Sequence, residues 1–312
     1  MKKSFLGLMF HHFHDNKRFL KNPGSLSADQ FYKMIKSFGK KNFISPDEFA
    51  ENCKNGNINT NQICITFDDG LRSQFEIAYP VMQSLNIQGF FFIPSSIFSK
   101  ELNILETVRY FKENFYQTVD EYYEDFFIKL KDFKDLKIIE SNLKKNHKQL
   151  IIIKKKFPFY SFEDVKYRFV RDYLISKEIF TKVNLVLFKK YKFNYKKINN
   201  IFFMSKNNLK VLTKEGNQVG LHSHSHPTKI SNLSYKKQLY EYSKNKIILE
   251  KITNKKIFSM SHPCNKYNSD TLKILKKLNI STGFLASKNL NFNKKIKNSN
   301  FLIPREDAGN LI

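Results

Sequence analysis

A chain of 312 residues with 41% hydrophobic and 15% aromatic residues can bury a large core, which argues against an intrinsically disordered protein. The formal net charge of +26 is extreme, but the lysines are spread over the whole chain and no nucleic-acid-binding module accompanies them. We therefore expect no nucleic-acid partner.

Three further observations favour a location in the cytoplasm. The cysteines, Cys53, Cys64 and Cys264, are few and odd in number, which argues against a disulfide framework. The apolar run at residues 5–10 is short and ends in histidines, so it is a poor signal peptide. No run approaches the ~18 to 20 apolar residues that cross a bilayer, and we expect no transmembrane segment.

The first hundred residues alternate between apolar strands and amphipathic helices. The predicted strands are residues 5–10, 63–67 and 89–94, and the predicted helices run from Ser27 to Gly39 and from Phe75 to Leu85. This alternation indicates parallel strands joined by crossover helices, and such sheets gather their chemistry at the carboxyl ends of the strands. His11, Asp68 and Asp69 each follow a strand directly and are expected at that edge.

From about residue 101 to residue 200 the pattern changes. Aromatic residues, lysine and isoleucine alternate with almost no glycine or proline, and apolar residues recur at helical spacing. We interpret this segment as a helical insertion that interrupts a single catalytic domain spanning residues 1–312.

Strands and helices return after the insertion. Strands are predicted at residues 219–221, 257–260 and 281–286, and the tail 301–307 closes the chain. Seven of the eight histidines fall in three places, 11–14, 222–226 and 262, and each place is a predicted strand end. Histidines scattered over a surface would not cluster in this way, which favours a metal-centred site.

The donors for such a site stand out by their spacing. His222 and His226 are four residues apart, so one helical turn or tight loop can aim both imidazoles at one point. Asp68 and Asp69 end an apolar strand, where two adjacent carboxylates are costly unless a cation neutralises them. A metal held by Asp69, His222 and His226 would do so. The alternatives are a polar loop with chance histidines and a solvated Asp-Gly turn.

Together the two stretches resemble two motifs of the polysaccharide deacetylases, the NodB-type homology domain of carbohydrate esterase family four. Residues 66–70 match the first motif, Thr-Phe-Asp-Asp-Gly, and residues 222–227 match the second, His-Ser/Thr-x-x-His followed by Pro. The resemblance runs from about residue 5 to residue 290. It implies an α/β fold, a distorted or incomplete (β/α)7 barrel. It also implies a divalent metal, expected to be zinc, on Asp69, His222 and His226.

The resemblance assigns Asp68 as the catalytic base, but the third motif, Arg-x-Pro-Tyr, is altered to Ser-His-Pro-Cys at residues 261–264. In the family the backbone N–H at the Tyr position contacts the oxyanion, and Cys264 can still supply it. The motif's arginine, which holds the base, is missing. Arg305 is a candidate substitute, and the alternative is a surface arginine in a salt bridge.

The family's late histidine, its usual general acid, is also missing, because no histidine follows His262. His11 and His262 are the candidates to replace it, and we favour His11 because its local sequence resembles the first strand of glycan deacetylases. For each, the alternative is a hydrogen-bonded core histidine. His224 is expected to point away from His222 and is not assigned as a ligand.

The function that this resemblance implies is hydrolytic removal of N-acetyl groups from an amino sugar in a surface glycan or its precursor. Two alternatives stay open. The same site could cleave a non-sugar amide, or the protein could be a catalytically inert glycan-binding or assembly protein that keeps the fold. No oligomeric state is predicted.

Overall fold

The computed structural model describes residues 5–57, 61–99, 102–158, 160–287 and 300–311. The chain divides into two compact units. The barrel unit comprises Met1–Glu101 and Asn199–Ile312, and the helical unit comprises Leu102–Ile198. All seven strands lie in the barrel unit.

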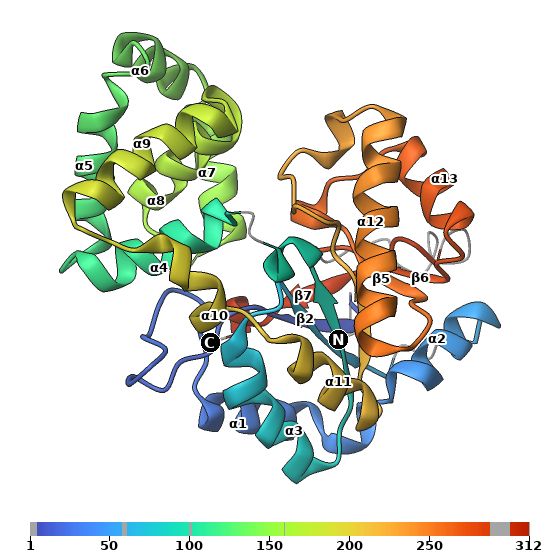
Figure 1. Ribbon diagram of the computed structural model, residues 1–312. Helices are drawn as coiled ribbons and strands as arrows, with labels where there is room; N and C mark the ends of the chain where they lie inside the picture. The colour runs from blue at the N-terminus through green and yellow to red at the C-terminus, as the bar shows by residue number, and fades with distance from the viewer. Residues whose placement is uncertain (1–4, 58–60, 100–101, 159, 288–299, 312) are drawn as a thin grey trace. The chain divides into compact units, whose positions relative to one another are not determined.

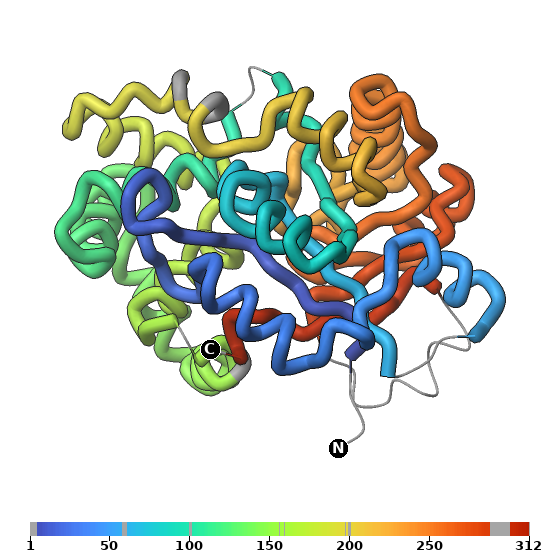
Figure 2. Tube along the Cα trace, turned by 90° about the horizontal axis from the view of Figure 1, so that it is seen from below, coloured from blue at the N-terminus to red at the C-terminus, as the bar shows by residue number. Residues whose placement is uncertain are grey.

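The barrel unit is built on one sheet of seven parallel strands in the order β6-β5-β4-β3-β2-β1-β7 (Figure 1). The strands are β1 Gly7–Phe10, β2 Cys64–Asp68, β3 Gly89–Ile93, β4 Gln218–Leu221, β5 Ser259–Ser261, β6 Thr282–Phe284 and β7 Arg305–Asp307. β1 lies beside β7, as the blue and red segments in Figure 2 show. Between β6 and β7 a single bridge, Phe284 to Ile303, replaces a regular ladder and leaves a seam. The predicted distorted (β/α)7 barrel is confirmed.

Helices surround these strands. They are α1 Ala28–Phe38, α2 Pro46–Lys54, α3 Tyr79–Leu85, α11 Lys206–Lys214, α12 Tyr235–Thr253 and α13 Ser269–Lys277, while α10 Ile198–Phe202 begins at the last residue of the helical unit. Ser27 caps α1 in a capping box with Gln30, as the sequence predicts for this residue. Pro80 stands in the first turn of α3, where a missing N–H costs nothing.

Alternate residues of β3 show how the sheet separates two apolar layers. Phe91 packs outward in the large cluster that includes residues of α1 and α3, and its ring stacks on that of Phe67 at 4.5 Å. Phe90 and Phe92 belong to a second cluster with Phe284 of β6. This second cluster fills the barrel interior, and Phe49 of α2 packs into it. Because both faces are buried, the strands read as continuous apolar runs.

The helical unit has a core of its own around Phe111, Tyr122 and Phe126. Its helices are α4 Ile104–Phe115, α5 Val119–Leu130, α6 Leu136–Lys145, α7 His147–Lys156, α8 Phe162–Phe169 and α9 Lys177–Lys190. No strand occurs among its described residues. The segment from about 101 to 200 is thus helical, while its status as an insertion within one catalytic domain stays a prediction.

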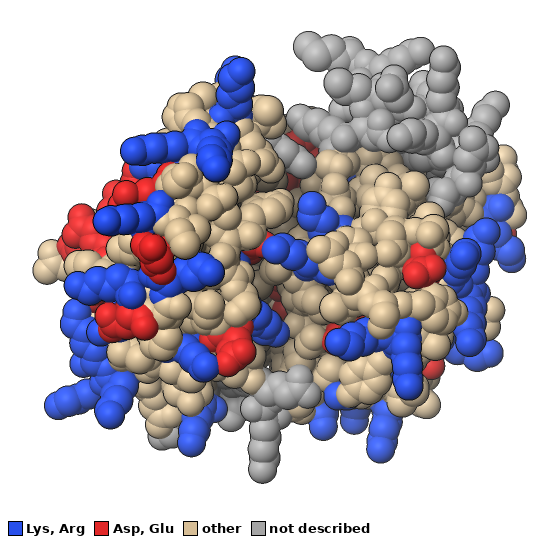
Figure 3. Space-filling view, turned by 90° about the horizontal axis from the view of Figure 1, so that it is seen from above, with Lys and Arg blue, Asp and Glu red and all other residues tan. Residues whose placement is uncertain are grey.

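In the face that Figure 3 shows, lysine and arginine side chains are spread widely over the molecule. Among the described residues, no helix has both the length and the apolar character needed to cross a membrane.

Candidate metal centre and active site

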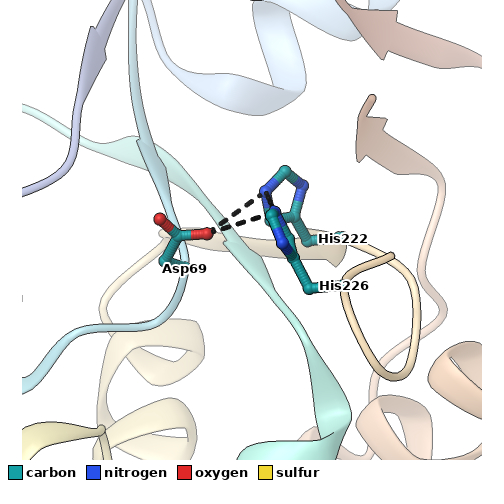
Figure 4. Close-up of side chains that lie close together, drawn as sticks. All are labelled: Asp69, His222 and His226. Atoms are coloured by element: carbon teal, nitrogen blue, oxygen red, sulfur yellow. Dashed lines mark hydrogen bonds and ion pairs between the residues drawn. The ribbon is translucent and has the colours of Figure 1, made fainter. Parts of the chain in front are cut away.

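Three predicted ligands converge at the carboxyl ends of β2 and β4, the two neighbours of β3 (Figure 4). Asp69 Oδ1 lies 3.4 Å from His222 Nε2 and 3.5 Å from His226 Nε2. The two Nε2 atoms are 3.1 Å apart. Each of the three residues offers one ligand atom, and these atoms lie within 4.8 Å of one another, so the group could hold a metal ion.

The spacing of these atoms fits one bound ion. Ligands about 2.0 to 2.1 Å from a tetrahedral zinc lie about 3.3 to 3.4 Å from one another, close to the three distances observed. The His222 Nδ1 donates to the carbonyl oxygen of Ser261 at 3.0 Å, which leaves the lone pair of Nε2 directed at the site. Burial and the neighbouring His222 lower the pKa of His226 to about 4, so that this ring stays neutral, as a ligand must.

The electrostatics of the site also favour a cation. Burial alone would lower the pKa of His222, but the carboxylates of Asp68 and Asp69 raise it overall. Burial would raise the pKa of Asp69, yet its hydrogen bond with His222 and the surrounding imidazoles hold it well below its usual range. The buried carboxylate of Asp68 and the half-buried one of Asp69 therefore draw positive charge to this point, which supports the metal interpretation of the Asp-Asp pair.

The backbone around the ligands is held in left-handed conformations that side chains rarely adopt. Asp69 has φ +76°, Ser223 +59° and His226 +50°. Such conformations persist where the surrounding structure enforces them, and they concentrate at functional sites. For the segment from His222 to His226, helix α12 supplies contacts that hold the backbone.

Two polar residues of α12 fix the histidine loop. Glu241 accepts hydrogen bonds from the backbone N–H and the hydroxyl of Ser225, both at 2.7 Å. Asn245 accepts from the backbone N–H of His222 at 3.0 Å and donates to the carbonyl of Ile93 at 2.9 Å. One turn of helix thus holds the segment that carries His222 and His226.

Asp68, the predicted base, is buried at the end of β2 and is held by Arg305 of β7. The two terminal nitrogens of Arg305 donate to the two carboxylate oxygens at 2.8 and 2.7 Å. Ser261, at the position of the family's arginine, also donates to Asp68 Oδ2, at 3.0 Å. Burial would raise the pKa of Asp68, but the Arg305 guanidinium, followed by His222, lowers it to about 2.

Arg305 is fully buried, so it is not a surface arginine. Its remaining N–H groups donate to the Thr66 hydroxyl, the Ser261 hydroxyl and the Leu285 carbonyl at 2.7 to 2.9 Å. All five donors of the guanidinium are therefore used. Its catalytic importance stays a prediction.

His11 follows β1, and its charge helps to lower the pKa values of both Asp68 and Asp69, which places it near the site. Gln74 fixes this placement. Its side-chain nitrogen donates to the backbone carbonyls of His11 and Asp68, at 2.9 and 2.6 Å. Gln74 is fully buried in a π-helical segment, a feature that is frequent at functional sites.

The other predicted residues lie elsewhere around the site. His262 is fully buried, with Nε2 2.8 Å from the Phe301 carbonyl, and burial lowers its pKa to about 4, which favours a hydrogen-bonded core histidine over a proton donor. Cys264 is exposed, with φ +50°. His224 turns to Ser95, with Nδ1 2.9 Å from its hydroxyl.

Sequence reasoning missed Gln74, Glu241 and Asn245. Glu241 and Asn245 are four residues apart on a helix whose buried face they share, and a polar pair on an apolar face was a usable signal. Gln74 gave no such signal, because its partners are backbone carbonyls of two other segments.

Comparison with known proteins supports the family resemblance. The family model for polysaccharide deacetylase matches residues 179–283, about a third of the chain, which include His222 and His226 but not the Asp-Asp pair. A search of curated proteins gave no match.

Solved structures share the fold. A Streptococcus pyogenes deacetylase, PplD, in complex with acetate is 14% identical with a TM-score of 0.55, over 98% of this chain and 96% of that one. IcaB from Ammonifex degensii is 11% identical with a TM-score of 0.54, over 97% and 90%. A de-N-acetylase from Aggregatibacter actinomycetemcomitans is 12% identical with a TM-score of 0.54, over 97% and 95%. The polysaccharide deacetylase model thus matches part of the barrel unit, and these solved deacetylases share the fold of this chain over nearly its whole length.

Proposed function

We propose that this protein is a metal-dependent hydrolase that removes N-acetyl groups from an amino sugar in a surface glycan or its precursor. The observation that carries the proposal is the convergence of Asp69, His222 and His226 within 3.5 Å of one another, beside a buried carboxylate that Arg305 holds. The names of similar structures, a deacetylase with bound acetate and a de-N-acetylase, support an acetylated substrate.

Asp69, His222 and His226 would hold the ion, with zinc as the expected metal. When bound, such an ion polarises an acyl oxygen and lowers the pKa of a coordinated water to about 7. Asp68 would accept the proton of the attacking water. Its Oδ2 already receives two hydrogen bonds and its Oδ1 one, so among the described contacts Oδ1 keeps a lone pair for that proton.

The remaining steps need a donor to the oxyanion and an acid for the leaving amine. The backbone N–H of Cys264 is our candidate for the first, because its residue occupies the corresponding position of the third motif. His11 is our candidate for the second. It follows β1 at the same edge of the sheet as Asp68 and Asp69, and the side chain of Gln74 joins its backbone carbonyl to that of Asp68.

The direct test measures acetate release from N-acetylglucosamine oligosaccharides by the purified protein, before and after treatment with a chelator. We expect release that the chelator abolishes and that one equivalent of zinc restores, together with loss of bound metal in His226→Ala. Saccharide binding without release, at full metal content, would instead indicate the inert glycan-binding protein. Release from simple amides but not from sugars would indicate the non-sugar hydrolase.

We also propose that the protein acts in the cytoplasm. The chain has only three cysteines, a sparse and odd-numbered set, which suits a reducing compartment. Cell fractionation with compartment markers tests this, and recovery of the protein outside the cytoplasmic fraction would contradict it.

A further inference from the structure

An exposed surface on α6 and α7 has no part in the proposed chemistry. We call it the α6–α7 face and define it by Ile138 and Lys145 of α6 and by Lys148, Ile152 and Lys155 of α7. Ile138 is 51% exposed and Ile152 is 65% exposed. The three lysines are exposed as well. Isolated exposed apolar residues are ordinary on protein surfaces. Here, however, Ile138 and Ile152 occur on helices that also carry the three exposed lysines.

Helical spacing places these residues on the outward side of each helix. In α7, Lys148 and Lys155 are four residues before and three after Ile152, so they flank it on one side. Leu150, on the opposite side, is buried. In α6, Ile138 and Lys145 are seven residues apart and share a side, whereas Ile139 is buried.

The charge is one-sided around α7, whereas α6 also carries the exposed Glu140. From residue 141 to residue 162 there are six lysines and no aspartate or glutamate. Isoleucines occupy residues 151–153 in the middle of this stretch. Lysines beside exposed aliphatic side chains combine the two contacts by which proteins bind a membrane surface, attraction to anionic lipid and burial of apolar area.

We propose that the α6–α7 face binds the surface of a membrane that contains anionic lipids. The lysines would contact lipid phosphates, since each basic residue near such a surface adds to the attraction. Ile138 and Ile152 would enter the boundary between headgroups and acyl chains, where their exposed area leaves water. A nucleic acid would satisfy the lysines but leave the isoleucines uncovered, because single-stranded sites use aromatic side chains to stack on bases.

Sedimentation of the full chain with lipid vesicles tests this, using phosphatidylcholine alone and phosphatidylcholine mixed with phosphatidylglycerol, at low and high salt. We expect binding to the anionic vesicles that high salt weakens. The double change Ile138→Ser and Ile152→Ser should weaken it about tenfold, because apolar burial is lost while the charge stays. Lys148→Glu with Lys155→Glu should weaken it further. Ile247→Ser is the matched control, since Ile247 of α12 is 66% exposed.

A second measurement does not depend on weakened variants. The chain contains no tryptophan, so Ile152→Trp introduces a single fluorescent reporter, and Ile247→Trp supplies its control. We expect the Ile152→Trp emission to shift to the blue on addition of anionic vesicles, and the control emission to stay unchanged.

Three results would overturn the proposal. The first is vesicle binding that depends on the lysines but is unaffected by the isoleucine changes. The second is binding to a single-stranded RNA homopolymer with none to vesicles. The third is self-association of the full chain that the isoleucine changes abolish, which would assign the face to a second copy of the protein.

Discussion

Arg305 donates one hydrogen bond to each carboxylate oxygen of Asp68, although the two residues are 237 positions apart in the chain. Arg305 comes from β7 and Asp68 from β2, and β1 separates the two strands. The guanidinium therefore reaches across the barrel interior, where it lies over the rings of Phe92 and Phe284. The orientation of the predicted base thus depends on the strand that completes the sheet beside the seam.

Replacing Arg305 with lysine should lower kcat/KM for deacetylation by about 10²-fold or more, because a single ammonium cannot reproduce the fork that orients Asp68. The pKa of Asp68 should rise at the same time, since Arg305 is its main cationic neighbour. The acid side of the pH–activity profile should accordingly move to higher pH. Arg18→Lys is the control, because Arg18 forms a more exposed pair with Glu76. An unshifted profile in Arg305→Lys would show that Asp68 is not the base.

Changing each of the two adjacent aspartates to asparagine should distinguish their roles, because one variant should lose turnover and the other metal affinity. Asp68→Asn should abolish turnover and keep the metal, because a base is needed only for proton transfer. Asp69→Asn should lose metal affinity, because its Oδ1 faces both ligand nitrogens. Metal content of the purified variants by mass spectrometry, measured beside acetate release, checks both outcomes. Loss of metal from Asp68→Asn would reverse the two assignments.

The site could be predicted where its residues follow apolar strands. β2 is recognisable in the sequence as an apolar run followed by Asp68 and Asp69, and β4 is an apolar run followed by His222. β7 has no such pattern, because its three residues are Arg305, Glu306 and Asp307. A strand made of charged residues can be recognised only when the strand that it pairs with is known.

Contacts between distant segments set a second limit on prediction. Nothing local tells whether Arg305 is buried, since the acceptors of its five donors come from strands or loops far away in the sequence. Gln74 is hidden for a related reason, because it binds main-chain oxygens, whose positions depend on the fold and not on residue type.

His11→Ala should reduce kcat by about 10² to 10⁴, the usual contribution of a general acid, while metal content stays unchanged. His147→Ala, in an exposed residue of the helical unit, is the control. Near-normal activity in His11→Ala would assign the proton to another donor or to water.

Gln74→Met should lower kcat, because His11 is then no longer held in place. Methionine has a similar length but no donor, so the carbonyls of His11 and Asp68 lose their partner, at a cost of about 1 to 3 kcal/mol in unfolding free energy. The fall in kcat should be large in the wild-type background and small in His11→Ala, as a double-mutant cycle measures. Gln83→Met, at an exposed position of α3, is the control. Equal effects in both backgrounds would mean that Gln74 has only a structural role.

His262 should make folding stability depend on pH in the mildly acidic range. Burial lowers the pKa of His262 to about 4 in the folded protein, from 6.5 in the unfolded chain. Between these values the unfolded chain binds the extra proton, so stability is complete above about pH 6.5 and falls as the pH approaches 4.

The contribution of this one residue between pH 7 and pH 5 is about 2 kcal/mol. His262→Gln keeps a donor for the Phe301 carbonyl but cannot titrate. Between pH 7 and pH 5 the unfolding free energy of the variant should therefore fall by about 2 kcal/mol less than that of the wild-type protein. Chemical denaturation of both proteins at the two pH values, with chelator present throughout, isolates this difference from metal binding. Equal losses in the two proteins would show that His262 is not held neutral in the barrel.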